Sequence, residues 1–212
     1  MNAPVSEFPA RRRELIGSGR FVLVVGPSGA GKDTVIAGAK AACGRDPTII
    51  FPRRVVTRPI TDAEDHDSLS DSSFDCAVKN NMFAFWWQAH GLKYGIPQST
   101  GNDIRAGRTV VCNVSRGIVA EVQARYARVD AVLVIAPPDI ISARLTGRSR
   151  QTDGPLTQRI ERNASFKDFR PDYVIENIGT ADTAVKTLLD MIYAKAPLPA
   201  VYQEYPGDNQ QD

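Results

Sequence analysis

Residues 21–33 read FVLVVGPSGAGKD, and this stretch decides the fold. Five consecutive apolar residues, from Phe21 to Val25, are typical of a buried parallel strand. The residues from Asp33 to Cys43 can form a helix, and a glycine-rich turn that ends in lysine lies between the two elements. A strand, a glycine-rich turn, a lysine and a helix together are the context of a phosphate-binding loop. We therefore predict that this turn binds nucleotide phosphates.

The predicted loop consists of Gly26, Pro27, Ser28, Gly29, Ala30, Gly31 and Lys32. Glycines allow the backbone to curl until successive N–H groups face an anion, and the following helix adds the positive end of its dipole. Lys32 supplies a mobile cation for the outer phosphates, and Thr34 lies in the first turn of the helix. A chance glycine-rich turn is the alternative, but the strand, the spacing, the lysine and the helix all favour the loop.

Asp33 follows the loop lysine, at the position where Ser or Thr normally contacts Mg²⁺. A carboxylate is also a good ligand for a hard cation, so we predict that Asp33 contacts Mg²⁺ directly or through water. A helix-capping role in the first turn is the alternative. The strand predicted over 109–114 carries Asn113 near its end, where many phosphate-loop enzymes have an aspartate. We hypothesise that the negative charge has moved from the strand end to the loop.

The rest of the chain alternates short apolar runs with helical patterns. Strands are predicted over 48–56 (broken near Pro52), 109–114, 130–136 and 173–176, and helices over 115–126, 139–146, 156–166 and 180–195. This alternation favours a three-layer α/β fold with a parallel sheet. Residues from about 57 to 101 are mixed and rich in aromatic side chains, so we expect an inserted lobe there. Residues 1–20 read as a lead-in and 196–212 as a disordered tail.

Composition limits the class of protein. The chain has 212 residues, of which 42% are apolar and 24% charged, so we expect one folded domain, over 21–195. A net charge of +2 is too small for a bulk nucleic-acid binder, and no apolar run approaches the roughly 18 residues that span a membrane. Three isolated cysteines favour a reducing compartment, so a cytoplasmic protein is expected. The oligomeric state stays open, a homodimer included.

Arginine outnumbers lysine by 19 to 7. A guanidinium can hold phosphate in two places, although a GC-rich genome would also favour arginine. One cluster, near the start of the lobe, comprises Arg53, Arg54 and Arg58; a second, around the polar loop after residue 146, comprises Arg144, Arg148, Arg150, Arg159 and Arg162. Phosphoryl transfer needs cations over the transferring group. We favour functional roles for Arg58, Arg148 and Arg159, and solvated surface roles for Arg150 and Arg162.

Several motifs resemble guanylate kinases in order and spacing: Gly26–Lys32, Thr57-Arg58-Pro59, Tyr94-Gly95, Ala143-Arg144-Leu145 with Gly147-Arg148, and Gln158-Arg159-Ile160. The resemblance covers about residues 20–195 and implies a P-loop kinase fold, an acceptor-binding lobe and an arginine-bearing lid at about 147–157. It implies that Arg58 contacts the acceptor phosphate and that Arg144 lies along the nucleotide. It also implies that Lys32, Arg148 and Arg159 are catalytic.

The residues by which guanylate kinases recognise guanine are absent at the matching positions of this sequence. Phe85 stands where a carboxylate precedes the lobe tryptophan, and Ile96 stands where a hydroxyl residue follows Tyr-Gly. Arg54 occupies the place of a small hydroxyl residue. An unpaired purine edge in a closed site is costly, so guanine is a poor candidate acceptor. A nucleoside monophosphate kinase of altered specificity and a non-catalytic guanylate-kinase-like binding module remain the alternatives.

A second family is more similar. Gly26–Asp33, Thr57-Arg58-Pro59, Glu64 with His66, Tyr94-Gly95, and Asn113 with Ser115-Arg116 resemble ribose 1,5-bisphosphate phosphokinases, in which an Asp and an Asn are expected at 33 and 113. That family uses ATP to convert ribose 1,5-bisphosphate into 5-phosphoribosyl 1-diphosphate and is associated with bacterial phosphonate breakdown.

This resemblance implies ATP and Mg²⁺ as cofactors and a small sugar phosphate as the partner. Arg54 would add a cation for the extra phosphate, and Tyr94 would belong to the acceptor site. Glu64, His66 and Asn113 are candidates for contacts with the ribose hydroxyls. The chain's two histidines, His66 and His90, could equally be structural.

Overall fold

The computed structural model describes residues 15–59, 66–89, 91–146 and 169–194. Its main sheet is parallel, with the strand order β2-β7-β1-β8-β9. These strands are β1 (Arg20–Val25), β2 (Ile49–Ile50), β7 (Thr109–Asn113), β8 (Val129–Ile135) and β9 (Tyr173–Glu176). Every residue of β1 is buried, as expected for a central strand that has helices on both faces.

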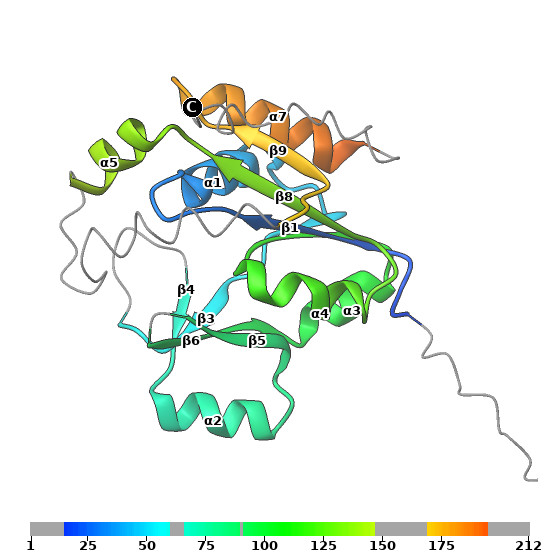
Figure 1. The fold of residues 1–212 in the computed structure, drawn as a ribbon. Helices are drawn as coiled ribbons and strands as arrows, with labels where there is room; N and C mark the ends of the chain where they lie inside the picture. Colours follow the sequence, from blue (N-terminus) through cyan, green and yellow to red (C-terminus); the bar gives the residue numbers. More distant parts are fainter. Residues whose placement is uncertain (1–14, 60–65, 90, 147–168, 195–212) are drawn as a thin grey trace, which may run out of the picture.

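Helices cover both faces of the main sheet (Figure 1). On one face lie α1 (Lys32–Cys43) and α7 (Ala181–Tyr193), and on the other α3 (Ser99–Arg105), a short 3₁₀ turn (Arg116–Ile118) and α4 (Val119–Gln123). Each face has its own buried cluster, one around Val35 and Leu188 and the other around Phe21 and Val122. The predicted three-layer α/β fold is therefore confirmed.

A second, smaller sheet forms the inserted lobe and has the order β4-β3-β6-β5. Its strands are β3 (Arg54–Val56), β4 (His66–Ser68), β5 (Phe83–Ala89) and β6 (Leu92–Pro97). The antiparallel hairpin β5–β6 packs its outer aromatic residues against α2 (Asp71–Lys79), where Phe74 stacks on Phe83. Figure 1 shows this sheet and α2 below the main sheet, next to the end of β1 where α1 begins.

The predicted break near Pro52 in the strand over 48–56 is present, but its two halves belong to different sheets instead of one. Ile49–Ile50 pairs with β7 in the main sheet, whereas Arg54–Val56 belongs to the lobe sheet. Pro52 lies between them, and proline has no N–H to donate to a sheet. The lobe sheet consequently begins at Arg54, a few residues before the predicted lobe boundary.

The helix predicted over 115–126 is also shorter than expected, because its first turn is 3₁₀ and α4 ends at Gln123. The helix α5 (Pro138–Thr146) agrees with its prediction to within one residue. The helix predicted over 156–166, the lid at about 147–157, residues 1–14 and the tail from 196 lie outside the described residues. Within the described ranges, no helix is both long and apolar enough to cross a membrane.

Candidate active site

The glycine-rich loop connects β1 to α1, as predicted. Gly26 has a φ of 148°, and a Cβ there would collide with the carbonyl oxygen of Val134 in the neighbouring strand β8, so only glycine fits. Gly31 has a φ of 89° and directly precedes α1. The first N–H groups of a helix have no intrahelical acceptor, and the helix dipole makes this end positive. The loop is therefore suited to an anion.

Lys32 lies over this loop. Its Nζ donates hydrogen bonds to the carbonyl oxygens of Gly26 at 2.8 Å and Pro27 at 2.9 Å. Burial lowers the pKa of Lys32 to about 8; the carboxylate of Asp33 partly opposes this shift, and the nearby Arg54 adds to it. The ammonium group is thus placed inside the loop, and it loses its proton more readily than an ordinary lysine.

The family resemblance implies ATP as the nucleotide, and the pKa of Lys32 then predicts how the use of ATP depends on pH. The charged ammonium attracts phosphates, and the free protein holds that charge only below about pH 8. We expect kcat/KM for ATP to be constant below this pH and to fall about tenfold per pH unit above it, because kcat/KM reports the ionisation of the free enzyme. Initial rates between pH 6.5 and 9.5, with MgATP below its KM, measure this. A profile that stays flat to pH 9.5 would contradict it.

Asp33 joins the loop to the end of β7 and to the lobe. Its Oδ1 accepts a hydrogen bond from Nδ2 of Asn113 at 2.7 Å and lies 3.8 Å from Nη2 of Arg54. The strand-end position and the loop position singled out in the sequence are therefore in direct contact. A second carboxylate at 113 would repel Asp33, whereas the amide of Asn113 holds it in place. The Asp33 side chain keeps 48% of its surface exposed.

The geometry of Asp33 fits a magnesium ion carried by nucleotide phosphates. Such an ion needs only one or two protein carboxylates, because phosphates and waters supply the remaining ligands. Among the described residues, no group of three or more His, Cys, Asp or Glu side chains could hold a metal alone. An accessible carboxylate beside the phosphate loop is what such shared coordination requires.

Arg54 and Arg53 point to different surroundings, as expected for neighbours in an extended strand. Arg54, with a side chain 17% exposed, faces Asp33, and its Cζ lies 5.8 Å from the centre of the Tyr94 ring. Tyr94 in turn stacks on Trp87, with ring centres 5.4 Å apart. Arg53 is 51% exposed and pairs with Asp67 at 3.2 Å. Of the two, Arg54 is the cation that the lobe presents to the loop.

Two of the three guanine-reading positions are filled by core residues. Phe85 is 2% exposed and Ile96 is 0% exposed, and the two are paired across the β5–β6 hairpin. Both belong to the cluster around Phe21, whose ring centre lies 5.6 Å from that of Phe85. These side chains offer neither a hydrogen bond nor an accessible surface to a purine.

Two residues that are distant in sequence donate side-chain hydrogen bonds to the backbone of the phosphate loop. Arg144, in α5, donates to the carbonyls of Ala30 and Asn177, and Asn177 donates to the carbonyl of Ala30. Asn177 is not among the residues predicted from the sequence. A polar residue directly after the predicted strand 173–176 is the only signal that could have indicated it.

The remaining predicted residues differ in where they lie. Ser28 and Thr34 are exposed. Arg58 is half-buried, and its backbone carbonyl accepts a hydrogen bond from the Ser68 hydroxyl at 2.7 Å. His66 is 0% exposed, which favours the structural role and not a ligand contact. The predicted residues Glu64, His90, Arg148, Arg150, Arg159 and Arg162 lie outside the described residues.

A phosphate loop with its lysine, on a parallel sheet that carries an inserted lobe, defines a P-loop kinase of the guanylate kinase architecture. A crystal structure of guanylate kinase from Anaplasma phagocytophilum has the same fold, with a TM-score of 0.61 and 15% identity, covering 84% of this chain and 87% of that one. No family model matches the sequence.

Curated relatives give the family. Ribose 1,5-bisphosphate phosphokinase PhnN of Rhodopseudomonas palustris is 45% identical over 88% of this chain and 94% of its own. The protein of the same description from Acidiphilium cryptum is 46% identical, over 87% of this chain and 98% of its own. The chain belongs to the ribose 1,5-bisphosphate phosphokinase family.

Proposed function

We propose that the protein transfers the terminal phosphoryl group of ATP to ribose 1,5-bisphosphate. An oxygen of the sugar's 1-phosphate forms a bond to the γ-phosphorus, and the bond between that phosphorus and the departing ADP breaks. The products are ADP and 5-phospho-α-D-ribose 1-diphosphate. Family membership supports this activity, and the structural observation that carries it is Arg54, a lobe cation facing the phosphate loop where a guanylate kinase reads its base.

The charge of the site suits a sugar bisphosphate. This acceptor has no base edge but carries two phosphates, and Arg54 and Arg58 both come from the lobe strand β3 or the residues just after it. Phe85 and Ile96, at the guanine-reading positions, are buried and apolar. These residues support a phosphate-bearing acceptor, because the lobe offers positive charge and Phe85 and Ile96 offer no polar contact to a nucleobase.

The reaction needs no general base. The attacking oxygen belongs to a phosphomonoester whose second pKa is near 6, so it is already ionised at pH 7. The protein then has to hold the two phosphate-bearing substrates in line and to stabilise the charge of the transferring group. On this proposal Lys32 serves the outer phosphates, and Tyr94 and Asn113 contribute to the acceptor site.

Magnesium, when bound, neutralises charge on the phosphates of ATP. Asp33 is the residue that would hold it, directly or through water. Arg144 would support the nucleotide, whereas Arg148, Arg159 and Glu64 are proposed from the family resemblance alone. The phosphonate-breakdown setting, a cytoplasmic location and a homodimer stay predictions.

Phosphorus NMR tests the activity directly. With ATP, Mg²⁺ and ribose 1,5-bisphosphate, we expect the 1-phosphate signal to be replaced by the two coupled signals of a 1-diphosphate, as ADP appears. GMP in place of the sugar is the comparison. Absence of the diphosphate, or a higher kcat/KM with GMP, would refute the proposed acceptor.

Exchanging Arg54 for methionine tests its assignment to the acceptor. We expect KM for ribose 1,5-bisphosphate to rise about tenfold or more, because charge-assisted hydrogen bonds contribute about 1.5–3 kcal/mol, while KM for ATP changes little. Arg53→Met is the matched control, since its side chain pairs with Asp67 instead of facing the loop. Equal effects of the two variants on the acceptor KM would show that Arg54 contributes only general charge.

A further inference from the structure

The carbonyl of Ala30 is held by two side chains from distant elements. Nδ2 of Asn177, directly after β9, donates to it at 2.8 Å, and Nη1 of Arg144 donates at 3.3 Å. Nη2 of Arg144 also donates to the carbonyl of Asn177 at 3.2 Å, so the three residues form a closed set. Ala30 is 0% and Asn177 2% exposed, so water does not compete for the bond between them.

These donors fix the peptide between Ala30 and Gly31. A trans peptide is planar, so its C=O and N–H point in opposite directions. Holding the Ala30 oxygen toward Asn177 therefore turns the Gly31 N–H away from Asn177. This N–H belongs to the loop whose amides serve the anion. Glycine allows such a peptide to rotate at little cost, so its orientation has to be imposed from outside.

Asn177 itself is tightly constrained. Its backbone N–H continues the β8–β9 pairing by donating to the carbonyl of Ile135 at 2.8 Å. A Cβ added at Gly31 would collide with its Nδ2, so the loop and the asparagine fit closely.

The asparagine also has a cost, because its Oδ1 is buried and has no hydrogen-bond partner among the described residues. An apolar residue of similar size would avoid this cost. The donor Nδ2 is therefore the feature that an asparagine brings to this position.

We propose that Asn177 is a positioning residue for ATP: it holds the Ala30–Gly31 peptide with its N–H turned to the phosphates, before the nucleotide arrives. The effect reaches the phosphates through the loop, with no requirement that Asn177 contact ATP. The proposal rests on the ATP-binding role of the loop stated above and is independent of which acceptor the protein uses.

The test compares a ligand that has a base with one that has none. The dissociation constants of MgATP and of magnesium tripolyphosphate are measured by calorimetry for the unmodified protein and for Asn177→Leu. We expect both ligands to bind roughly tenfold more weakly to the variant, as the loss of one buried hydrogen bond implies. The melting temperature should stay equal or rise, since the buried unpaired acceptor is removed. Asn102→Leu, on the exposed surface of α3, is the control and should change neither constant.

Two outcomes would overturn the proposal. Weaker binding of ATP with unchanged binding of tripolyphosphate would show that Asn177 contacts the base. Unchanged binding of both ligands would show that the Ala30–Gly31 peptide keeps its orientation without Asn177. If Asn177→Leu does not fold, Asn177→Ala removes the same donor without adding volume, and the same comparison applies. Neither binding measurement includes the sugar. If ribose 1,5-bisphosphate proves not to be the acceptor, the conclusion about Asn177 is therefore unaffected.

Discussion

Replacing Lys32 by methionine is expected to lower turnover on the order of 10³-fold, the effect of removing one pre-positioned charge from a transition state. The ammonium is the cation that the phosphate loop itself carries, at 2.8 and 2.9 Å from two loop carbonyls. Methionine has a similar length and volume but carries no charge, so it cannot stabilise the negative charge that develops on the transferring group. Steady-state ADP release with ribose 1,5-bisphosphate and saturating MgATP measures the loss.

The stability of this variant separates a catalytic loss from an unfolded protein. Burial lowers the pKa of Lys32 to about 8, which means that the native state disfavours its charged form. The methionine variant removes that penalty along with two hydrogen bonds, so we expect the melting temperature at pH 7 to change little.

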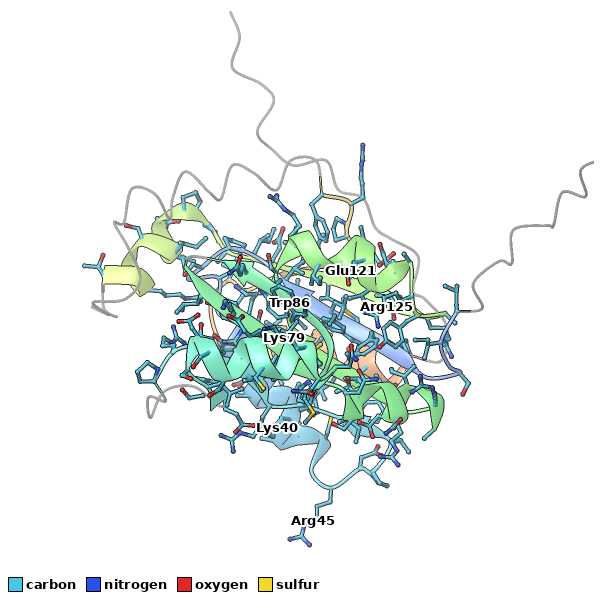
Figure 2. The ribbon with its side chains drawn as sticks, turned by 90° about the horizontal axis from the view of Figure 1, so that it is seen from below. Lys40, Arg45, Lys79, Trp86, Glu121 and Arg125 are labelled. Atoms are coloured by element: carbon cyan, nitrogen blue, oxygen red, sulfur yellow. The ribbon has the colours of Figure 1, made fainter. Side chains whose placement is uncertain are left out.

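Lys40→Met is the matched control. Lys40 lies on the same helix and is exposed, and Figure 2 shows it on the outer surface, in the same region as Arg45. This control should keep full turnover. Turnover of Lys32→Met within tenfold of the unmodified protein would remove Lys32 from the mechanism.

The parts of the site that were predicted from the sequence are those with a local signal. The run from Phe21 to Lys32 combines an apolar strand, glycines at fixed spacing and a lysine, all within twelve residues. Asp33 and Asn113 were linked by a different argument, because many phosphate-loop enzymes hold the metal with an aspartate at the strand end that Asn113 occupies. The 2.7 Å hydrogen bond between the two side chains shows that these positions lie together.

The errors and omissions arise where the determining contacts are distant in sequence. Ile49–Ile50 and Arg54–Val56 are too short to show which sheet each strand joins, and pairing with β7 or β6 decides it. Asn177 contacts Ala30 across 147 positions of sequence, and a single asparagine after a four-residue strand has no periodic pattern. The burial of His66 likewise depends on how the lobe packs, so the sequence left its role open.

Asp33→Asn is expected to lower turnover on the order of 100-fold and to raise the Mg²⁺ concentration that gives half-maximal rate, comparable to losses when metal-site partners are changed. The amide keeps the shape of the side chain and an oxygen that can accept from Asn113. It loses the negative charge that a hard cation prefers. Initial rates at fixed ATP, with Mg²⁺ varied in excess over ATP, measure both quantities.

The alternative role of Asp33, favourable interaction with the helix dipole, has its own control on the chain. Asp182 is exposed and lies in the first turn of α7, as Asp33 does in α1. Asp182→Asn removes only the dipole interaction, worth about 0.3–1 kcal/mol of stability. If Asp33→Asn lowers the melting temperature by the same small amount and leaves the Mg²⁺ dependence unchanged, Asp33 is a helix cap and the metal assignment is wrong.

Comparison with Arg54→Met then separates the metal from the acceptor, because Arg54 lies only 3.8 Å from Asp33. Loss of Arg54 should raise the acceptor KM at every Mg²⁺ concentration if its guanidinium contacts a phosphate of the sugar, as proposed. Loss of the Asp33 charge should be strongest when Mg²⁺ is scarce. Together the two variants assign the two sides of this contact, the carboxylate to the nucleotide's metal and the guanidinium to the acceptor.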